Sequence, residues 1–349
     1  MQSVILRNYG FTEGSFTINT FGSGLINHTW KVTHGGKDFI LQRINDEIFK
    51  QPVDIMGNIG LIAGFLSQMH PDYFFVAPVK TTDGKDIVYL KDEGYFRMFP
   101  FVKGSHSKNV VETPREAYEA AAQFGRFTKL LDGIPIDQLK IPIPDFHNLS
   151  LRHQQFLIAL KKGNPDRIKE TGVLSVELLR HSEIVAEYEK IITNISFKKR
   201  VTHHDTKISN VLFDNAGKGL CVIDLDTVMP GYFISDVGDM MRTYLSPVSE
   251  EEKDFTKIDI RTDFYNAIVN GYYSEMKDVL TEIEKQYFFY AGTFMIYMQA
   301  IRFLTDYLND DKYYGFKYPD QNLVRARNQA TLLKRLIEKK KTLTAIIKY

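Results

Sequence analysis

The sequence contains one cysteine and one tryptophan in 349 residues, and it lacks any long apolar run. The single cysteine, Cys221, excludes a disulfide framework within the chain, and its apolar surroundings indicate a small core residue rather than a nucleophile or a metal ligand. No segment approaches the ~18 to 20 apolar residues of a membrane-spanning helix, and the apolar stretch after Met1 is too short for a signal peptide. We therefore expect a cytoplasmic protein with no membrane partner.

The chain also lacks an excess of charge. It carries 44 Lys and Arg against 43 Asp and Glu, so its formal net charge is +1. Proteins that bind nucleic acid or anionic membrane surfaces generally carry a basic excess, so these partners are disfavoured. A hydrophobic content of 44% supports packed cores, and the length suffices for two lobes. The expected partners are small molecules, and the expected state is a monomer or a weak dimer.

The most informative stretch runs from His203 to Asn210, with the sequence His-His-Asp-Thr-Lys-Ile-Ser-Asn. Phosphoryl transfer requires a group that orients the acceptor hydroxyl and ligands that hold Mg²⁺ against the nucleotide phosphates. The pattern His-x-Asp-x-x-x-x-Asn is typical of kinase catalytic loops, in which Asp205 would take the hydroxyl proton and Asn210 would bind a metal. Lys207 would place positive charge on the transferring phosphoryl group.

A second acidic residue, Asp224, completes this pattern. Residues 211–213 and 219–223 are apolar and flank the turn sequence Asp-Asn-Ala-Gly, which predicts a two-stranded hairpin. Asn210 and Asp224 would then lie at the same end of the hairpin. The sequence predicts that these two residues bind Mg²⁺.

Strand patterns dominate the first hundred residues, and helical patterns dominate the rest. This predicts an α+β, protein-kinase-like two-lobed fold, with a small antiparallel-sheet lobe over 1–101 and a larger, mainly helical lobe over 102–349. The first lobe would contain one helix over 53–69 and strands over 16–19, 29–33, 39–44, 74–79, 87–90 and 95–99. The second would contain helices over 115–131, 176–192, 236–245, 259–276, 280–308 and 322–341.

Glycines between the first two predicted strands suit a phosphate-covering loop, because glycine lets backbone amides approach an anion closely. A kinase also needs a cation on the third strand, and Arg43 is the basic residue available there. The segment 54–70 contains no Glu to pair with it. The nucleotide-binding residues predicted from these patterns, with an aromatic connection for adenine, are Gly22, Ser23, Gly24, Arg43, Phe99 and Phe101.

Four longer strings carry a resemblance to a known family: HHDTKISNVLFD, CVIDLDTVMPG, DVGDMMR and RFLTDYL. They resemble the aminoglycoside phosphotransferase and choline kinase superfamily, and with the Gly-Leu-Ile-Asn run at 24–27 they are most similar to its N-acetylhexosamine 1-kinases. The resemblance implies ATP- and Mg²⁺-dependent phosphorylation of the anomeric hydroxyl of N-acetylglucosamine or N-acetylgalactosamine. The sugar-binding residues that it implies are His28, Asp205, Asp226, Arg302 and Tyr313.

Two features of this implied site follow from physical chemistry. Asp224 and Asp226 would share one face if they lay on a strand, so that Asp224 could bind the metal while Asp226 binds the sugar. Arg302 would repel a cationic acceptor such as an aminoglycoside, which favours a neutral polyhydroxylated acceptor, although Arg302 could instead pair with Asp306 one turn later.

Two other functions stay open at this level. The same catalytic loop would serve a kinase for another small alcohol, such as methylthioribose, homoserine or choline. Arg43 in place of the usual strand lysine also fits a nucleotide-binding protein that has lost catalysis. Protein kinase activity is disfavoured, because no Ala-Pro-Glu segment follows Asp224.

Overall fold

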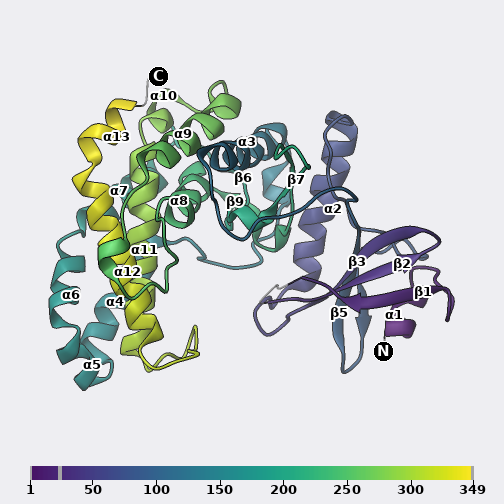
Figure 1. Cartoon of the computed structure of the whole chain (residues 1–349), viewed down its shortest axis with the longest axis horizontal. Coiled ribbons are helices and arrows are strands. Elements are labelled where there is room, and N and C mark those ends of the chain that lie inside the picture. Colours follow the sequence, from purple (N-terminus) through teal and green to yellow (C-terminus); the bar gives the residue numbers. More distant parts are fainter. Residues whose placement is uncertain (1, 23–25, 347–349) are drawn as a thin grey trace. The chain divides into compact units, whose positions relative to one another are not determined.

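The computed structural model describes residues 2–22 and 26–346. The chain forms two compact units, each drawn from three stretches of sequence (Figure 1). The first unit comprises Met1–Ser107, Leu130–Pro144 and Asn210–Pro230, and the second comprises Lys108–Lys129, Asp145–Ser209 and Gly231–Tyr349. The predicted α+β composition, with a small antiparallel sheet and a larger helical part, is confirmed. The functional division at residue 101 stays a prediction.

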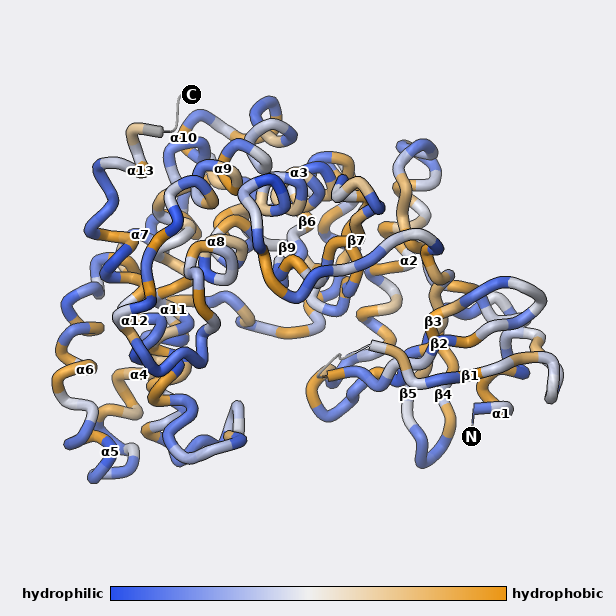
Figure 2. The backbone as a smooth tube through the Cα atoms, in the orientation of Figure 1, coloured by the Kyte–Doolittle hydropathy of each residue, from blue (hydrophilic) through white to orange (hydrophobic). Residues whose placement is uncertain are grey.

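The first unit is built on a five-stranded antiparallel sheet of order β1-β2-β3-β5-β4. Its strands are β1 (Phe16–Thr20), β2 (His28–His34), β3 (Lys37–Ile44), β4 (Val88–Leu90) and β5 (Gly94–Pro100). Gly35 and Gly36 join β2 to β3 with φ of 56° and 75°, a left-handed turn that glycine adopts without strain. Hydrophobic and hydrophilic residues follow one another along these strands (Figure 2), as a two-faced sheet requires.

One face of this sheet packs on a core that includes the short helix α1 (Gln2–Arg7), which the sequence patterns did not predict. Ile5 and Leu6 of α1 are fully buried against Leu41 and Met98. Burying an aliphatic side chain of this size stabilises by about 1.5 to 3 kcal/mol, so α1 closes this face despite its length.

The strand predicted over 74–79 is wrong. The structure assigns no strand there, and Val79 donates one backbone hydrogen bond to Met98 O at 2.7 Å. Pro78 lacks an N–H group, so this apolar run cannot continue a ladder along β5.

Helix α2 (Pro52–Met69) confirms the helix predicted over 53–69, with Pro52 in its first turn. The buried side chain of Asn58 on this helix connects the three stretches of the first unit. Its amide nitrogen donates to Lys140 O and Val228 O, both at 3.0 Å, and its oxygen accepts from Lys140 N at 2.8 Å. One polar residue thus satisfies three backbone groups, and its bond to Val228 O is buried.

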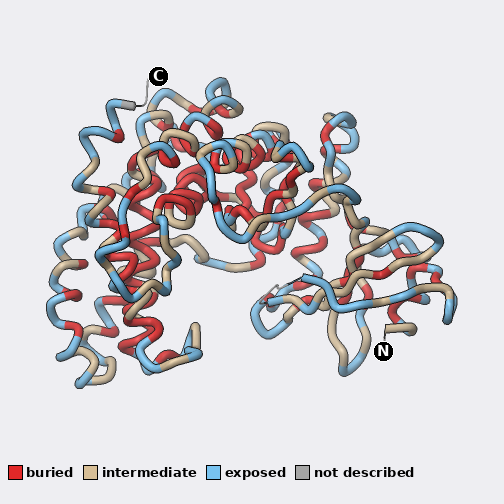
Figure 3. The backbone as a smooth tube through the Cα atoms, in the orientation of Figure 1, coloured by how far each residue is buried: buried red, intermediate tan, exposed pale blue. Residues whose placement is uncertain are grey.

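The second unit is helical, and α11 (Phe288–Leu308) lies at its centre. Helices α4 (Leu149–Lys162), α8 (Phe233–Tyr244) and α12 (Gln321–Glu338) pack around α11, and α8 and α11 are buried along most of their length (Figures 1 and 3). The remaining helices of this unit are α3 (Pro114–Leu130), α5 (Pro165–Glu170), α6 (Gly172–Leu179), α7 (Glu183–Thr193), α9 (Thr262–Met276), α10 (Glu282–Lys285) and α13 (Lys340–Ile346). Within the described part of the chain, no helix is long and apolar enough to cross a bilayer.

Two of the predicted helices are each interrupted. The helix predicted over 176–192 is wrong as a single element, because α6 ends at Leu179 and α7 begins at Glu183. The helix predicted over 280–308 divides into α10 and α11, and Thr281 and Glu284 form a reciprocal capping box at the start of α10. Helix α4 was not predicted, because few of its residues are buried.

Candidate active site

The hairpin of the first unit places Asn210 and Asp224 at one end. Strands β7 (Val211–Phe213) and β8 (Gly219–Val222) pair antiparallel with Val211 opposite Val222, and Ile223 N donates to Asn210 O at 2.9 Å. Asn210 directly precedes β7, and Asp224 follows β8 by two residues. Both residues therefore lie at the same end of the hairpin, as the sequence predicted. Asn210 is buried, whereas Asp224 is exposed, and the backbone of Asp224 is in the left-handed conformation with φ of 61°.

The two side chains suit a hard divalent cation. An amide oxygen and a carboxylate are ligands that Mg²⁺ accepts, and Mg²⁺ usually takes one or two protein ligands and completes its shell with phosphates and water. Among residues 2–22 and 26–346, no group of three or more His, Cys, Asp or Glu side chains is arranged to hold a metal. This end of the hairpin thus fits a metal that a nucleotide helps to bind.

Asp226 lies in a different setting from the one predicted. Residues Leu225–Thr227 form a 3₁₀ turn (η3) rather than a strand, so the prediction that Asp224 and Asp226 share a strand face is wrong. Asp226 is 2% exposed, and its two oxygens accept from the guanidinium of Arg97 and, at 2.7 Å, from the amide of Asn27. The left-handed backbone at Asp224 redirects the chain and turns Asp226 inward.

Arg97 on β5 shares its sheet face with Gln42 on β3. These residues lie opposite each other in register, and Arg97 Nε donates to Gln42 Oε1 at 3.0 Å. The guanidinium also lies 5.2 Å from the ring centre of Phe99. Sequence analysis missed the role of Arg97, because a buried ion pair 129 residues apart leaves no local pattern.

Arg43 and His28 lie on the opposite face. Side chains alternate along a strand, so Arg43, next to Gln42, projects away from Arg97. In register, Arg43 lies opposite both Phe96 and His28. The structure therefore does not bring Arg43 onto the face of Phe99, and Asn27, rather than His28, contacts Asp226. Ligand roles for Arg43 and His28 stay predictions.

The start of the glycine loop packs near Phe101. The rings of Phe21 and Phe101 meet edge to face at 5.7 Å, and the Lys31 ammonium lies 4.4 Å from the ring centre of Phe101. Gly22 adopts a left-handed φ of 76°, and Ser23 and Gly24 fall outside the described residues. Sequence analysis missed Lys31, because it sought a cation on the third strand alone.

The catalytic-loop residues of the second unit include a carboxylate and a neighbouring ammonium. Lys207 Nζ lies 3.0 Å from Asp205 Oδ1, and the Asp205 side chain is 27% exposed, which leaves it open to a ligand. Burial alone would lower the pKa of Lys207, but the carboxylates of Asp205 and Asp239 raise it above its ordinary value. Lys207 therefore keeps its charge at neutral pH.

Two aspartates of α8 hold this loop. Asp236 accepts from the backbone N–H groups of His203 and His204 at 2.9 and 2.8 Å, and Asp239 accepts from that of Thr206 at 2.8 Å. These bonds fix the backbone on both sides of Asp205. Sequence analysis assigned no role to these aspartates, although two carboxylates one turn apart on an apolar helix were a usable signal.

Asp236 is fully buried, and burial raises its pKa to about 7, against the lowering effect of the two backbone donors. The adjacent carboxylate of Asp239 raises this pKa further, although Asp239 is itself engaged by Arg242. The support beneath the loop is thus sensitive to pH.

His204 has a left-handed φ of 65° and lies against Gly231. A Cβ atom at Gly231 would overlap the Thr202 hydroxyl and the His204 ring, so this position requires glycine. The His204 ring lies 5.2 Å from that of His147, which begins a chain of side chains leading from the loop to α11.

Arg302 and Tyr313 line a common cavity of ≈ 330 Å³ in the second unit. The Arg302 guanidinium lies 5.9 Å from the centre of the Tyr313 ring. Arg302 does not pair with Asp306, whose carboxylate accepts the backbone N–H groups of Tyr313 and Tyr314 at 2.7 and 2.9 Å. The structure thus joins two of the five residues predicted to bind sugar.

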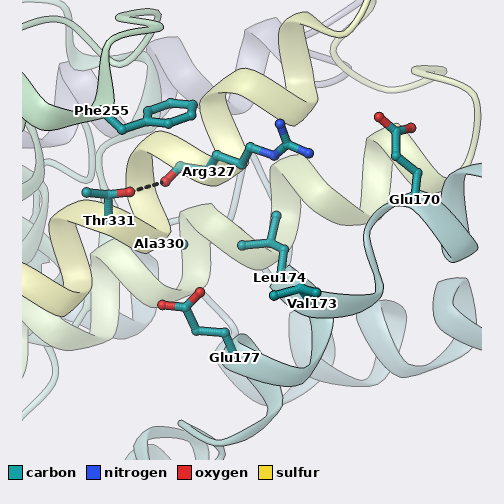
Figure 4. A pocket seen from close by; sticks show the side chains of 8 residues that line it. All are labelled: Glu170, Val173, Leu174, Glu177, Phe255, Arg327, Ala330 and Thr331. Atoms are coloured by element: carbon teal, nitrogen blue, oxygen red, sulfur yellow. Dashed lines mark hydrogen bonds between the residues drawn. The ribbon is translucent and has the colours of Figure 1, made fainter.

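A second cavity of ≈ 260 Å³ lies where α6 and α12 meet the 3₁₀ turn η4 (Phe255–Lys257). Figure 4 shows the Phe255 and Arg327 side chains at this cavity, with Thr331 donating to Arg327 O at 2.8 Å. None of the predicted site residues lines it.

Solved structures share this fold. The microcompartment-associated aminopropanol kinase matches with a TM-score of 0.66 and 15% identity over 98% of each chain. The amicoumacin kinase hAmiN, in complex with AMP-PNP, Ca²⁺ and Ami, matches with a TM-score of 0.63 and 17% identity over 96% of this chain and 93% of that one. Choline kinase from Cryptosporidium parvum Iowa II matches with a TM-score of 0.59 and 11% identity over 97% and 96%. The predicted kinase-like two-lobed fold is confirmed.

The family model described as the phosphotransferase enzyme family, APH, matches residues 17–260. This range contains β1 to α8, and with them the catalytic loop, the hairpin and the aspartates that hold the loop. The resemblance found in the sequence is confirmed at this level, and the chain belongs to the APH phosphotransferase enzyme family.

Proposed function

We propose that this protein is an ATP- and Mg²⁺-dependent small-molecule kinase that phosphorylates the anomeric hydroxyl of an N-acetylhexosamine. The observation that carries the kinase assignment is the catalytic loop, in which Asp205 remains accessible while its flanking backbone is fixed by Asp236 and Asp239. Family membership supports the same reaction class. Phosphoryl transfer depends on positioning and charge stabilisation, and a rigid loop with an open carboxylate supplies both.

In this proposal Asp205 accepts the proton of the acceptor hydroxyl. The hydroxyl oxygen forms a bond to the γ-phosphorus of ATP, and the bond from that phosphorus to ADP breaks. Lys207, which retains its proton, stabilises negative charge on the transferring group. Asn210 and Asp224 would hold Mg²⁺, which would neutralise the nucleotide phosphates.

Nucleotide binding is proposed for the lobe over 1–101, with Gly22, Ser23 and Gly24 on the phosphates and Phe99 and Phe101 beside adenine. Lys31, beside Phe101, is a further cation of that lobe, and its ammonium pairs with the Asp38 carboxylate at 2.9 Å. Arg43 stays a prediction for the phosphates.

The acceptor assignment rests on the sequence resemblance and on the composition of the cavity beside α11. Arg302 supplies hydrogen-bond donors, and Tyr313 and Tyr314 supply aromatic faces on which a sugar ring could stack. A guanidinium also disfavours cationic acceptors such as choline or an aminoglycoside. His28 and Asp226 stay predictions for sugar binding, as do a cytoplasmic location and a monomeric or weakly dimeric state.

The test is a coupled assay of ADP release with ATP and Mg²⁺. Its acceptor panel comprises N-acetylglucosamine, N-acetylgalactosamine, plain hexoses, methylthioribose, homoserine, choline, an aminoglycoside and the methyl glycosides of the active sugars. Turnover of free N-acetylhexosamines that disappears when the anomeric oxygen is methylated supports the proposal. Turnover that survives methylation places the phosphate on another hydroxyl, and turnover of choline alone contradicts the acceptor assignment.

Asp205→Asn tests the catalytic role in the same assay. A carboxamide cannot accept the hydroxyl proton, so turnover should fall by at least about 100-fold, in line with the contribution of general-base catalysis. Asp214→Asn, in the turn between β7 and β8, is the matched control and should keep activity. Nucleotide binding that persists in Asp205→Asn separates loss of chemistry from loss of folding.

A further inference from the structure

Two guanidinium groups line the cavity beside α11. Arg152 projects from α4 and Arg302 from α11, and both line this cavity of ≈ 330 Å³. Among the described residues, neither arginine forms an ion pair. Arg302 Nη1 donates to Gln299 Oε1 at 3.2 Å. Arg152 donates to the neutral oxygens of Gln155 and Asp145 O at 3.1 and 2.8 Å.

The one carboxylate of the lining is already engaged. Both oxygens of Asp306 accept backbone N–H groups, from Tyr313 and Tyr314, and the amide of Asn322 donates to one of them at 3.1 Å. Asp306 is 4% exposed and therefore organises the 313–314 loop. These neutral donors satisfy the lone pairs of Asp306 without cancelling its charge, so the lining carries two guanidinium charges against one carboxylate charge.

Two polar atoms of the lining are buried without a hydrogen-bond partner. These are Arg152 Nε and Thr305 Oγ1. A buried donor without a partner is destabilising, so native proteins usually pair such groups or use them for a ligand. Both groups can donate, and a ligand that satisfies them must supply acceptor atoms.

The charges around the cavity favour an anionic ligand group as the partner of these hydrogen-bond donors. Burial lowers the pKa of Arg152, and the charge of Arg302 lowers it further, against the smaller raising effects of Tyr313, Tyr314 and the Asp145 carboxylate. Burial also drives the pKa of His147 well below its ordinary value, and the charges of Arg302 and Arg152 add to this effect. Cations that repel one another in a partly dry site gain most when an anion binds among them.

Side-chain contacts connect this cavity to the catalytic loop. The Arg302 guanidinium lies 5.8 Å from the ring centre of Phe146, and that ring lies 6.4 Å from the ring of His204. His204 directly precedes Asp205 in the chain. Two side-chain contacts within the second unit thus connect an arginine of the cavity to the residue before Asp205.

We propose that Arg152 and Arg302 bind a carboxylate or phosphate group carried by the acceptor, so that the preferred substrate is an N-acetylhexosamine that bears such an acidic group. This inference rests on the proposed function, because it assumes that the cavity is the acceptor site. Carboxylate and phosphate both match the planar fork of donors that a guanidinium presents.

The first test is calorimetric and needs no turnover. N-acetylglucosamine, its 6-phosphate, glucuronic acid, glucose and inorganic phosphate are titrated into the wild-type protein. Each charged sugar should bind at least about tenfold tighter than its neutral counterpart, since a charge-assisted hydrogen bond contributes about 1.5 to 3 kcal/mol and 1.4 kcal/mol is tenfold in affinity. Equal affinities of charged and neutral sugars would overturn the inference.

Arg152→Gln tests the residue assignment. It should remove most of the affinity advantage of the 6-phosphate while leaving the binding of neutral N-acetylglucosamine within about twofold. Arg180→Gln, an exposed arginine at the end of α6, carries the same charge change and should match the wild type. An advantage that persists in Arg152→Gln contradicts the assignment.

If Arg152→Gln does not fold, competition on the wild-type protein decides. Inorganic phosphate should displace the 6-phosphate from the anion subsite and weaken neutral N-acetylglucosamine binding much less. Binding of inorganic phosphate without any advantage for the phosphorylated sugar identifies a free-phosphate site and overturns the acceptor assignment.

The two proposals fail in different ways in the ADP-release assay. Turnover of neutral N-acetylhexosamines with no preference for charged ones keeps the kinase proposal and overturns the anion subsite. Turnover confined to charged sugars supports the anion subsite and contradicts the proposal that neutral N-acetylhexosamines are the preferred acceptors.

Discussion

Replacing Arg97 by Met should destabilise the first unit more than any exposed charge change. The side chains of Arg97 and Asp226 are 1% and 3% exposed, so the substitution leaves a buried carboxylate with one remaining partner, Asn27. Removing one member of a buried ion pair costs about 3 to 5 kcal/mol. Since domains are stable by only about 5 to 15 kcal/mol, the change should consume a large part of the stability of this unit.

The double variant Arg97→Met/Asp226→Leu isolates the reason for this loss. If the cost arises from the orphaned charge, removing both charges should restore much of the stability, because apolar replacement of a buried pair is often neutral or stabilising. The two single costs should then exceed the double cost by at least about 2 kcal/mol.

Trp30 gives a local signal for this experiment. It is the one tryptophan of the chain and lies on β2, in the same unit as the pair. Urea unfolding followed by its fluorescence should therefore report the first unit. Arg7→Gln is the control, because the Arg7 and Glu13 side chains are 60% and 70% exposed and such pairs contribute about 0 to 1 kcal/mol. A loss below 1 kcal/mol in Arg97→Met, or strict additivity in the double variant, would refute the reasoning.

Three further predictions follow from the fold. Because burial raises the pKa of Asp236 to about 7, the native chain holds this proton to higher pH than the unfolded chain, whose value is about 4. The resulting stabilisation is complete below that value and is lost as pH rises to 7, so Asp236→Asn should flatten this part of the plot of urea midpoint against pH; an unchanged slope would contradict the assignment. Gly231→Ala should lower stability by about 1 to 3 kcal/mol and reduce turnover, because the new methyl group overlaps the His204 ring; the melting temperature and ADP release measure this, and Gly64→Ala, with open space on α2, is the control that should not lose stability. Asn58→Leu should cost about 1 to 3 kcal/mol, because it leaves the buried carbonyl oxygen of Val228 without its donor, and a Trp30-monitored urea midpoint equal to that of the wild type would argue against this role.

Local sequence patterns predicted the elements that carry the chemistry. The hairpin with Asn210 and Asp224 at one end was predictable, because its turn residues and its two apolar runs are adjacent in sequence. Helix α2 was predictable for the same reason, from its period and its initial Pro52.

Long-range contacts determined what the sequence patterns missed. The inward turn of Asp226 depends on Arg97 and Asn27, which are 129 and 199 residues away. The position of Arg43 on the sheet face opposite Phe99 follows from strand register, which no single-strand pattern reveals. The break between α6 and α7 lacks a glycine or proline, and its one local signal is Ser182, an N-cap residue type directly before α7 whose side chain makes no capping bond.

The Asn58 contacts also constrain the order in which the chain can mature during synthesis. The first unit requires Asn210–Pro230, so the sheet made from the first hundred residues emerges from the ribosome long before its remaining parts. During that interval Arg97 lacks its carboxylate and the Asn58 amide lacks Val228. All five strands of the sheet are present at that stage, but the first unit cannot complete its buried contacts as it emerges. A nascent chain of intermediate length therefore carries a guanidinium and an amide that still lack these native partners.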